Sequence, residues 1–326
     1  ANLGAAAGGL TFDGGTLGVT GTGYTATNRA IVLGAGGGGF DIDAAANRFT
    51  AAGDITGSGD LHKQGGGTLV LTGSNAYGNT LVHAGTLVGH AGSISGAIGN
   101  AGTVVFDQAG NARFGGDIAG LGGTAGTMIK RGAGNLTLAG TSSLNWAIEA
   151  GGIVSATGRF RGDAKIDAGA SLTFDQAVDG SYAGSISGPG EFAKSGAGTA
   201  RLTGDSSSFS GITTVSGGQL LVGDLSGGRL GGAVTVLSGA TLSGPGTIGS
   251  AGSQIRINAG GDHRPGDGTA SGQQVVAGDY VNHGTLTIVG GPSGTSRIVV
   301  AGSVDITDAR LDLLLSPKNA ADWSIT

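Results

Sequence analysis

The chain has 326 residues, of which 73 are glycine and none is cysteine, and its 17 basic and 22 acidic residues give a net charge of −5. The charges are scattered singly, so there is no basic patch to neutralise phosphates and the sequence excludes nucleic-acid binding. A hydrophobic fraction of 38% with only 12% charged residues excludes disorder, and scarce proline without a Gly-X-Y period excludes collagen.

Three further compositional features bear on where the chain works. The absence of cysteine fits an exported protein that avoids disulfides. The longest apolar runs, such as residues 311–315, are far too short to cross a bilayer. The chain starts at Ala1 with no methionine and no signal sequence, and we expect it to be a mature piece of a longer protein.

In chain order, one long unit occurs three times, near residues 53–89, 116–158 and 184–223. A lysine holds the same place in each unit, and its spacing along the chain is nearly constant: Lys63, Lys130 and Lys194. Each unit follows a phenylalanine–aspartate pair in a strand-like run, and these phenylalanines recur with almost the same period: Phe40, Phe106 and Phe174. Tandem units of this kind predict stacked rungs, with the phenylalanines forming an internal ladder.

Within each unit, short runs alternate apolar and small polar residues, and glycines separate the runs. Residues 68–72, 80–82 and 86–88 are examples in the first unit. A period of two predicts strands that bury one face, and no segment shows a helical period over ten residues. We therefore predict an all-β fold, a right-handed parallel β-helix (β-solenoid) of roughly 14–15 coils with roughly 20–24 residues in each coil. A propeller is the structural alternative, but blades of about 65 residues are too long for one.

At this point the residues resemble a known family. Residues 194–204 (KSGAGTARLTG) followed by 213–220 (TTVSGGQL) look like the autotransporter-associated β-strand repeat, and residues 65–73 and 132–140 are similar to its first half. Residues 9–17 resemble the segment that often precedes such repeats. The third unit departs from the pattern at Ala200 and Arg201, and the second has residues 145–149 (NWAIE) in place of the Thr-Thr-Val strand, which predicts a bulge or a different surface there.

The C-terminal portion resembles a second element of the same family. Residues 244–248, 259–266, 276–280 and 284–288 are similar to the junction, or autochaperone, region of passenger domains, and residues 297–302 and 309–315 continue the pattern. The resemblance implies a repeat-built β-helix over 1–239 and an autochaperone-like junction region over 240–326, which nucleates folding during secretion. It also implies export across the outer membrane of a Gram-negative bacterium to the cell surface or medium, with the chain's own C-terminal outer-membrane β-barrel as a partner.

The residues that usually carry chemistry are better explained by structure. The five histidines form no HExxH motif, and we expect His62 and His83 to be solvated or turn residues. Gly204-Asp205-Ser206 is similar to the start of a serine-protease GDSG motif, but Ser207 replaces the last glycine and the segment falls at a repeat turn. Aspartates near glycines are typical of β-turns, and they lack the regular spacing of calcium repeats. We therefore predict no catalytic residue, no metal ligand and no cofactor.

One short motif suggests binding. Arg161-Gly162-Asp163 places a cation and a carboxylate on either side of a glycine, the arrangement that integrins recognise, between two strand-like runs. We predict that these three residues are a receptor-binding candidate.

Together these observations predict a non-catalytic adhesin that binds a host cell surface or extracellular matrix, another copy of itself, or both. Flat faces of serine, threonine, asparagine and aspartate suit many weak contacts whose sum gives avidity. Two alternatives stay open: a stalk that presents an upstream domain, and a passenger enzyme that acts on glycans or is a protease.

Overall fold

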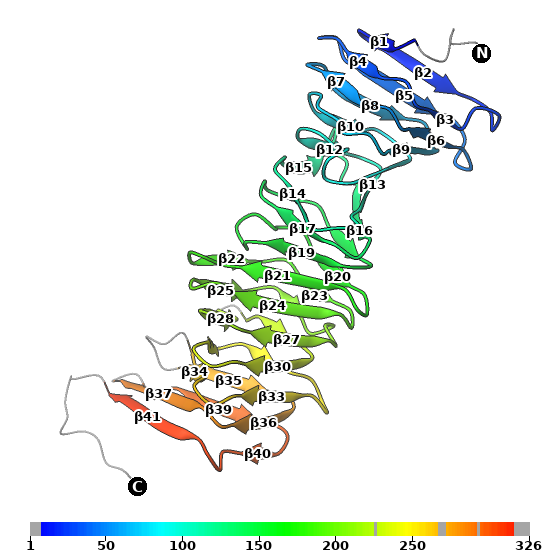
Figure 1. Ribbon diagram of the computed structural model, residues 1–326. Coiled ribbons are helices and arrows are strands. Elements are labelled where there is room, and N and C mark those ends of the chain that lie inside the picture. Colours follow the sequence, from blue (N-terminus) through cyan, green and yellow to red (C-terminus); the bar gives the residue numbers. More distant parts are fainter. Residues whose placement is uncertain (1–7, 225–226, 267–271, 292–293, 316–326) are drawn as a thin grey trace. The chain divides into compact units, whose positions relative to one another are not determined.

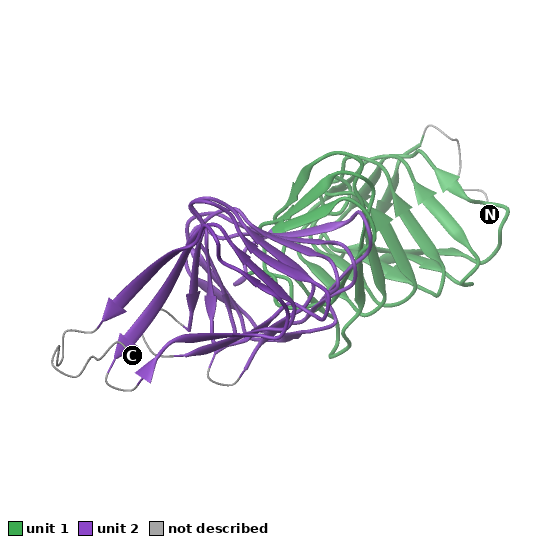
Figure 2. Cartoon of the chain, turned by 90° about the horizontal axis from the view of Figure 1, so that it is seen from below, with its two compact units in different colours: residues 1–154, 159–163 green, residues 155–158, 164–326 purple. Residues whose placement is uncertain are grey.

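The computed structural model describes residues 8–224, 227–266, 272–291 and 294–315. Within those ranges the regular elements are β-strands and no helix occurs (Figure 1). Contacts divide the chain into two compact units, Ala1–Val154 with Arg159–Asp163 (unit 1) and Ser155–Gly158 with Ala164–Thr326 (unit 2) (Figure 2). Each unit is described below by itself.

Unit 1 is built from four sets of parallel strands. One set holds β1 (Leu10–Phe12), β4 (Ile31–Leu33) and β7 (Ile55–Gly57). A second holds β2 (Gly15–Val19), β5 (Gly38–Ile42), β8 (Leu61–Gln64), β10 (Thr80–Val82), β12 (Ile98–Asn100) and β15 (Ile118–Gly120). A third holds β3 (Ala26–Thr27), β6 (Arg48–Ala51), β9 (Thr68–Leu71), β11 (Thr86–Gly89), β13 (Thr103–Asp107), β16 (Thr127–Arg131) and β18 (Trp146–Ile148). The fourth holds β14 (Ala112–Phe114), β17 (Asn135–Leu138) and β19 (Gly152–Ser155).

Unit 2 repeats this arrangement. One set holds β20 (Ala164–Ile166) and β23 (Ile186–Ser187). The next holds β21 (Ser171–Asp175), β24 (Glu191–Ser195), β27 (Ile212–Val215), β30 (Ala233–Val236), β33 (Gln254–Ile257), β36 (Asp279–Asn282) and β40 (Val304–Asp305). A third holds β22 (Gly180–Tyr182), β25 (Thr199–Leu202), β28 (Gln219–Val222), β31 (Thr241–Gly244), β34 (Asp262–Pro265) and β37 (Thr285–Gly291), which pairs with the antiparallel β38 (Gly294–Thr295) and the parallel β41 (Arg310–Leu315). The last holds β26 (Asp205–Ser206), β29 (Arg229–Leu230), β32 (Thr247–Ile248), β35 (Gln273–Val276) and β39 (Arg297–Val300).

The parallel registers confirm the predicted β-solenoid, with about 14 coils. Gly38 and Leu61 are register partners, and the coil between them has the predicted length. Thr86 and Thr103 are also partners, but the coil between them is shorter than the roughly 20–24 residues that the sequence predicts. The coils therefore differ in length, and some are tighter than predicted.

Burial alternates along the strands as the period of two predicts. In β24 and β33 the second and fourth residues are buried and their neighbours are more exposed. Inward positions carry valine, isoleucine, leucine and phenylalanine, which remove apolar surface from water along the axis of the coil. The predicted bulge at residues 145–149 is wrong, because β18 keeps a continuous register with β16 and buries Trp146 in the core.

The three repeat lysines are fully buried. Each ammonium group donates three hydrogen bonds to backbone carbonyl oxygens, two in the turn that follows it and one in the next coil. For Lys130 the acceptors are Arg131 at 2.6 Å, Gly132 at 2.8 Å and Ala150 at 3.1 Å. The acceptors are Gln64, Gly65 and Ala84 for Lys63, and Ser195, Gly196 and Gly217 for Lys194. Because every donor of the ammonium is used, the charge is compatible with burial, and the lysine links consecutive turns.

The predicted phenylalanine ladder is wrong. Phe40 lies in β5 and Phe106 in β13, which belong to two different sheets of unit 1. The reason is that the repeat is longer than a whole number of coils. Lys63 and Gly120 occupy the same place on one sheet, three coils apart, but Lys130 comes further along the chain. The intervening residues 121–126 carry the chain to the next sheet, where Lys130 lies on β16.

A polar network lies in the core of unit 2. His263, Gln274 and Asn282 are fully buried, and Tyr280 is nearly so. His263 contacts the Tyr280 hydroxyl through Nδ1 at 2.7 Å and the Gln274 Oε1 through Nε2 at 2.6 Å. The network lies within the range 240–326 that the sequence predicts to be a junction region. That assignment stays a prediction. Three stretches of the predicted junction region lie outside the described residues: 267–271, 292–293 and 316–326.

Candidate functional site

The Arg161-Gly162-Asp163 tripeptide lies in unit 1 and leads into β20. Its backbone is held against the preceding coil. The Arg161 amide donates to the Ser142 carbonyl at 2.9 Å, and the Asp163 amide donates to Asn145 Oδ1 at 2.8 Å. The Trp146 amide in turn donates to the Asp163 carbonyl at 2.8 Å. The segment is therefore a rung of the solenoid, and it is not a projecting loop.

Side chains alternate across this rung. Arg161 and Asp163 are exposed, and Gly162 between them is buried. A Cβ atom on Gly162 would lie 2.0 Å from the Leu144 carbonyl oxygen, so only glycine fits this close approach of two backbones. The arrangement presents a guanidinium and a carboxylate on the outer side of a fixed backbone. Whether the tripeptide binds a receptor is a prediction that its placement does not test.

His62 and His83 form a pair that the sequence did not reveal. His62 lies on β8 and His83 follows β10, the next strand of the same sheet. Nδ1 of His62 is 3.1 Å from Nε2 of His83, and the ring planes differ by 13°. His83 is exposed and His62 is half-buried, which agrees with the expected solvated positions. Register alone does not pair them, because His62 is the partner of Leu81 and Lys63 is the partner of Val82, so that His83 lies diagonally across from His62.

The protease-like serine is a core residue. Ser206 ends the short strand β26, is buried, and accepts a hydrogen bond from the Ile186 amide at 2.9 Å. Its hydroxyl is thus committed to the preceding coil. Asp205 accepts a hydrogen bond from the Ser207 amide at 2.9 Å, which is an ordinary turn contact.

Aspartates act mainly as turn caps between coils. Asp117 Oδ1 accepts hydrogen bonds from the amide of Thr141 at 2.7 Å and from its hydroxyl at 2.9 Å. The bond from the amide contributes most and the bond from the hydroxyl less, and together they lower the pKa of Asp117 below its ordinary value. The same contact with Thr199 lowers the pKa of Asp179. Over the described ranges, no group of three or more histidines, aspartates or glutamates is placed to hold a metal ion.

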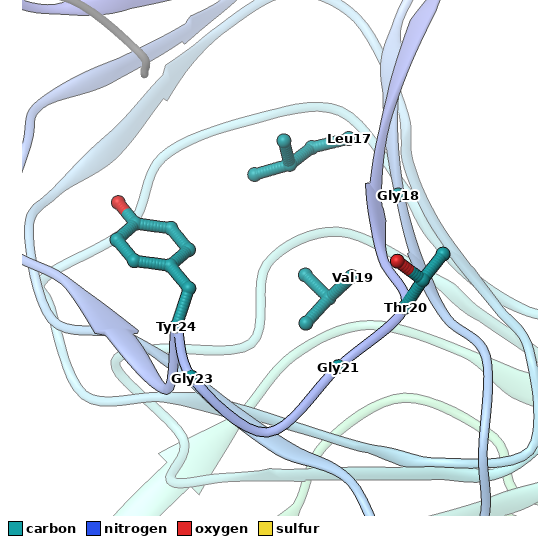
Figure 3. Close-up of a pocket in the computed structure, with 7 residues that line it drawn as sticks. All are labelled: Leu17, Gly18, Val19, Thr20, Gly21, Gly23 and Tyr24. Atoms are coloured by element: carbon teal, nitrogen blue, oxygen red, sulfur yellow. The ribbon is translucent and has the colours of Figure 1, made fainter. Parts of the chain in front are cut away.

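Two surface hollows lie away from the tripeptide and from the histidine pair. One, of about 410 Å³, is near the beginning of unit 1, where Leu17, Val19 and Tyr24 point into a common space (Figure 3). The other, also about 410 Å³, lies on β22, β25 and β28 and is lined by Asp179, Gly180, Ser181, Thr199, Arg201, Gln219 and Leu221. The second hollow contains Arg201, one of the two departures from the repeat pattern, and it offers a cation with amide and hydroxyl groups to a polar ligand.

These features define a β-solenoid whose repeats each contain a buried lysine bound to turn carbonyls. The passenger-associated transport repeat family matches residues 61–88, 128–145 and 192–222. Each matched segment begins two residues before a buried lysine, namely Lys63, Lys130 or Lys194. Each matched segment thus contains the lysine and the two turn carbonyls that follow it.

A curated relative agrees with this assignment. The chain is 36% identical over 214 residues, 65% of its length, to a protein named adhesin BmaC autotransporter from Brucella suis biovar 1 (strain 1330). The chain spans about 5% of the length of that relative. No solved structure matches the chain. The repeat match and this relative support an autotransporter passenger with such repeats, and they indicate export across the outer membrane to the cell surface of a Gram-negative bacterium. The described residues contain no helix that is long and apolar enough to cross a membrane.

Proposed function

We propose that this passenger is a non-catalytic adhesin that binds a host cell surface, the extracellular matrix or another copy of itself. The observation that carries the proposal is the 36% identity, over 65% of the chain, to a relative named an adhesin. The outer surface supports it, because exposed serine, threonine, asparagine and aspartate side chains recur on successive coils. Many weak contacts along such a surface give avidity without a deep site. Its other partner is the outer-membrane barrel of its own autotransporter.

Within this proposal, Arg161 and Asp163 are the receptor-contacting residues. Both side chains are exposed, while three backbone hydrogen bonds hold the rung that carries them. A fixed backbone lowers the entropy lost when a partner binds. The Arg201 hollow is a second place where a polar host ligand fits, and its variant belongs in the same test.

The test is adhesion of beads coated with the purified chain to host cells and to matrix proteins. We expect the native chain to adhere, Arg161→Ala and Asp163→Glu to abolish most of that adhesion, and Lys165→Ala, an exposed cation two residues past Asp163, to leave it unchanged. No adhesion by the native chain, together with no self-association in sedimentation, would refute the adhesin. Adhesion that persists in both tripeptide variants but falls in Arg201→Ala would move the contact to the hollow.

The alternatives give different results. A stalk that presents an upstream domain neither adheres nor self-associates. A glycan-acting or protease passenger releases products from polysaccharide or protein substrates, whereas the adhesin leaves them intact.

A further inference from the structure

The His62 and His83 imidazoles meet through ring nitrogens. The nitrogens are 3.1 Å apart while the ring centroids are 5.4 Å apart, so the rings approach edge to edge. Both side chains lie on the outer side of the β8–β10 pair, where the inward neighbours are Lys63 and Val82. The fold thus places two imidazoles side by side on the outside of successive coils.

The separation of the two nitrogens suits a shared cation. Metal–nitrogen bonds of imidazole are about 2.0–2.1 Å long, so an ion bonded to two nitrogens 3.1 Å apart would subtend an angle of about 100°. That angle fits two neighbouring positions of a tetrahedral or a square-planar complex. We propose that His62 and His83 form a surface site for a transition-metal cation of the Cu²⁺, Ni²⁺ and Zn²⁺ class.

The chemistry of the donors selects that class. Neutral imidazole binds copper, nickel and zinc, whereas calcium and magnesium require mainly oxygen ligands. Both side chains reach solvent, and an ion bound to both nitrogens would replace the proton that they share in the hydrogen bond between them. Among divalent ions, Cu²⁺ is expected to bind most tightly.

The backbone beneath the pair is fixed. The His83 amide donates to the Lys63 carbonyl at 2.9 Å. The Lys63 ammonium donates to the carbonyl of Gln64, the next residue, and to the carbonyl of Ala84, which follows His83. The buried lysine therefore holds the two histidine-bearing segments in register. A preorganised pair of ligands loses less entropy on chelation than two independent side chains.

Two other polar residues lie near the pair on the same sheet. Gln64 follows Lys63 on β8, and Asp41 is its register partner on β5. Asp41 Oδ1 lies against the Gly65 turn, so it is directed away from the histidines. The sequence motifs predicted no metal ligand, and the proposed site departs from that expectation.

Calorimetric titration of the tag-free chain with CuCl₂ and ZnCl₂ at pH 7.4 tests the proposal. We expect one ion per chain, at least about tenfold weaker binding in His62→Ala and in His83→Ala, and no change in His90→Ala, the matched control. Binding should disappear at pH 5, where protons compete for the imidazoles, and Mg²⁺ should not bind at neutral pH. Thermal melting verifies that each variant is folded.

Electron paramagnetic resonance of the Cu²⁺ complex gives a readout independent of affinity. We expect hyperfine coupling to two imidazole nitrogens in the native chain and to fewer in either variant. No binding of Cu²⁺ in either measurement, or equal loss of binding in His90→Ala, overturns the proposal.

Discussion

Phe106 and Lys130 are register partners on the neighbouring parallel strands β13 and β16, and both side chains are fully buried. The same relationship joins Phe40 to Lys63 and Phe174 to Lys194. The aliphatic stem of each lysine thus lies beside a phenylalanine, while its ammonium group reaches three carbonyl oxygens of the turns. The repeat is a local unit that satisfies its own buried charge.

Replacement of Lys130 by methionine should destabilise the chain strongly. Methionine keeps the apolar stem but leaves the carbonyls of Arg131, Gly132 and Ala150 without the donor that they share. Loss of a buried charged partner of this kind lowers the free energy of unfolding by about 2–4 kcal/mol. Urea unfolding followed by circular dichroism measures the change.

Lys165→Met is the matched control for that experiment. The Lys165 side chain is 65% exposed and makes a surface ion pair with Asp167 at 3.0 Å. Surface pairs contribute little, so this variant should stay within about 1 kcal/mol of the native chain. Equal unfolding midpoints for the two variants would mean that the buried hydrogen bonds contribute nothing to stability.

The position of these lysines could be predicted from the sequence, but their role could not. Their nearly constant spacing marks Lys63, Lys130 and Lys194 as equivalent, and alternation marks the strands around them. A lysine on a strand is normally solvated, and its burial depends on turn carbonyls brought together by two coils. The phenylalanine ladder was wrongly predicted for a related reason: a fixed repeat length does not say how many residues close one coil.

The network around His263 has only one consistent arrangement of protons. Gln274 presents Oε1, an acceptor, so Nε2 of His263 carries the proton and Nδ1 accepts from the Tyr280 hydroxyl. Gln274 Nε2 donates to the Ser243 carbonyl at 3.1 Å, and Asn282 Nδ2 donates to the Tyr280 oxygen at 2.9 Å. A proton added at Nδ1 would displace the hydroxyl proton that Tyr280 donates there. Burial accordingly lowers the pKa of His263 to about 4, although the Gln274 contact and Asp262 oppose the shift.

This shift predicts that mild acid destabilises unit 2. The ordinary pKa of histidine is 6.5 and the folded value is about 4. Between these values the unfolded chain binds more protons, so the free energy of unfolding is highest above pH 6.5 and falls as the pH drops toward 4. The loss across that window should be about 3 kcal/mol. Urea titrations at intervals from pH 7 to pH 4 measure it.

His263→Gln is the informative variant for the same series. Glutamine is neutral at every pH of the series, so the variant should be less stable at pH 7 but should show a much flatter dependence between pH 6.5 and 4. The lowered pKa values of Asp117 and Asp179 act only at more acidic pH, because their ordinary value is 3.8. An unchanged slope in His263→Gln would assign the acid sensitivity to other groups. The burial of His263 itself could not be predicted, since its partners Gln274 and Tyr280 lie on other strands of the same coil and alternation does not show which inward side chains meet.

Glycine at position 132 is required by the turn that receives the Lys130 ammonium. Its φ is +73°, and a Cβ atom there would lie 2.6 Å from the Gln108 carbonyl oxygen in the preceding coil. Gly132→Ala should therefore lower the free energy of unfolding by about 1–3 kcal/mol, through backbone strain and displacement of the turn.

Gly115→Ala is the control, because a Cβ atom on Gly115 meets nothing within 4 Å. That substitution should leave stability unchanged or raise it slightly, since alanine restricts the unfolded chain. If urea unfolding ranks the two variants in the opposite order, the turn carbonyls around Lys130 do not need the left-handed conformation.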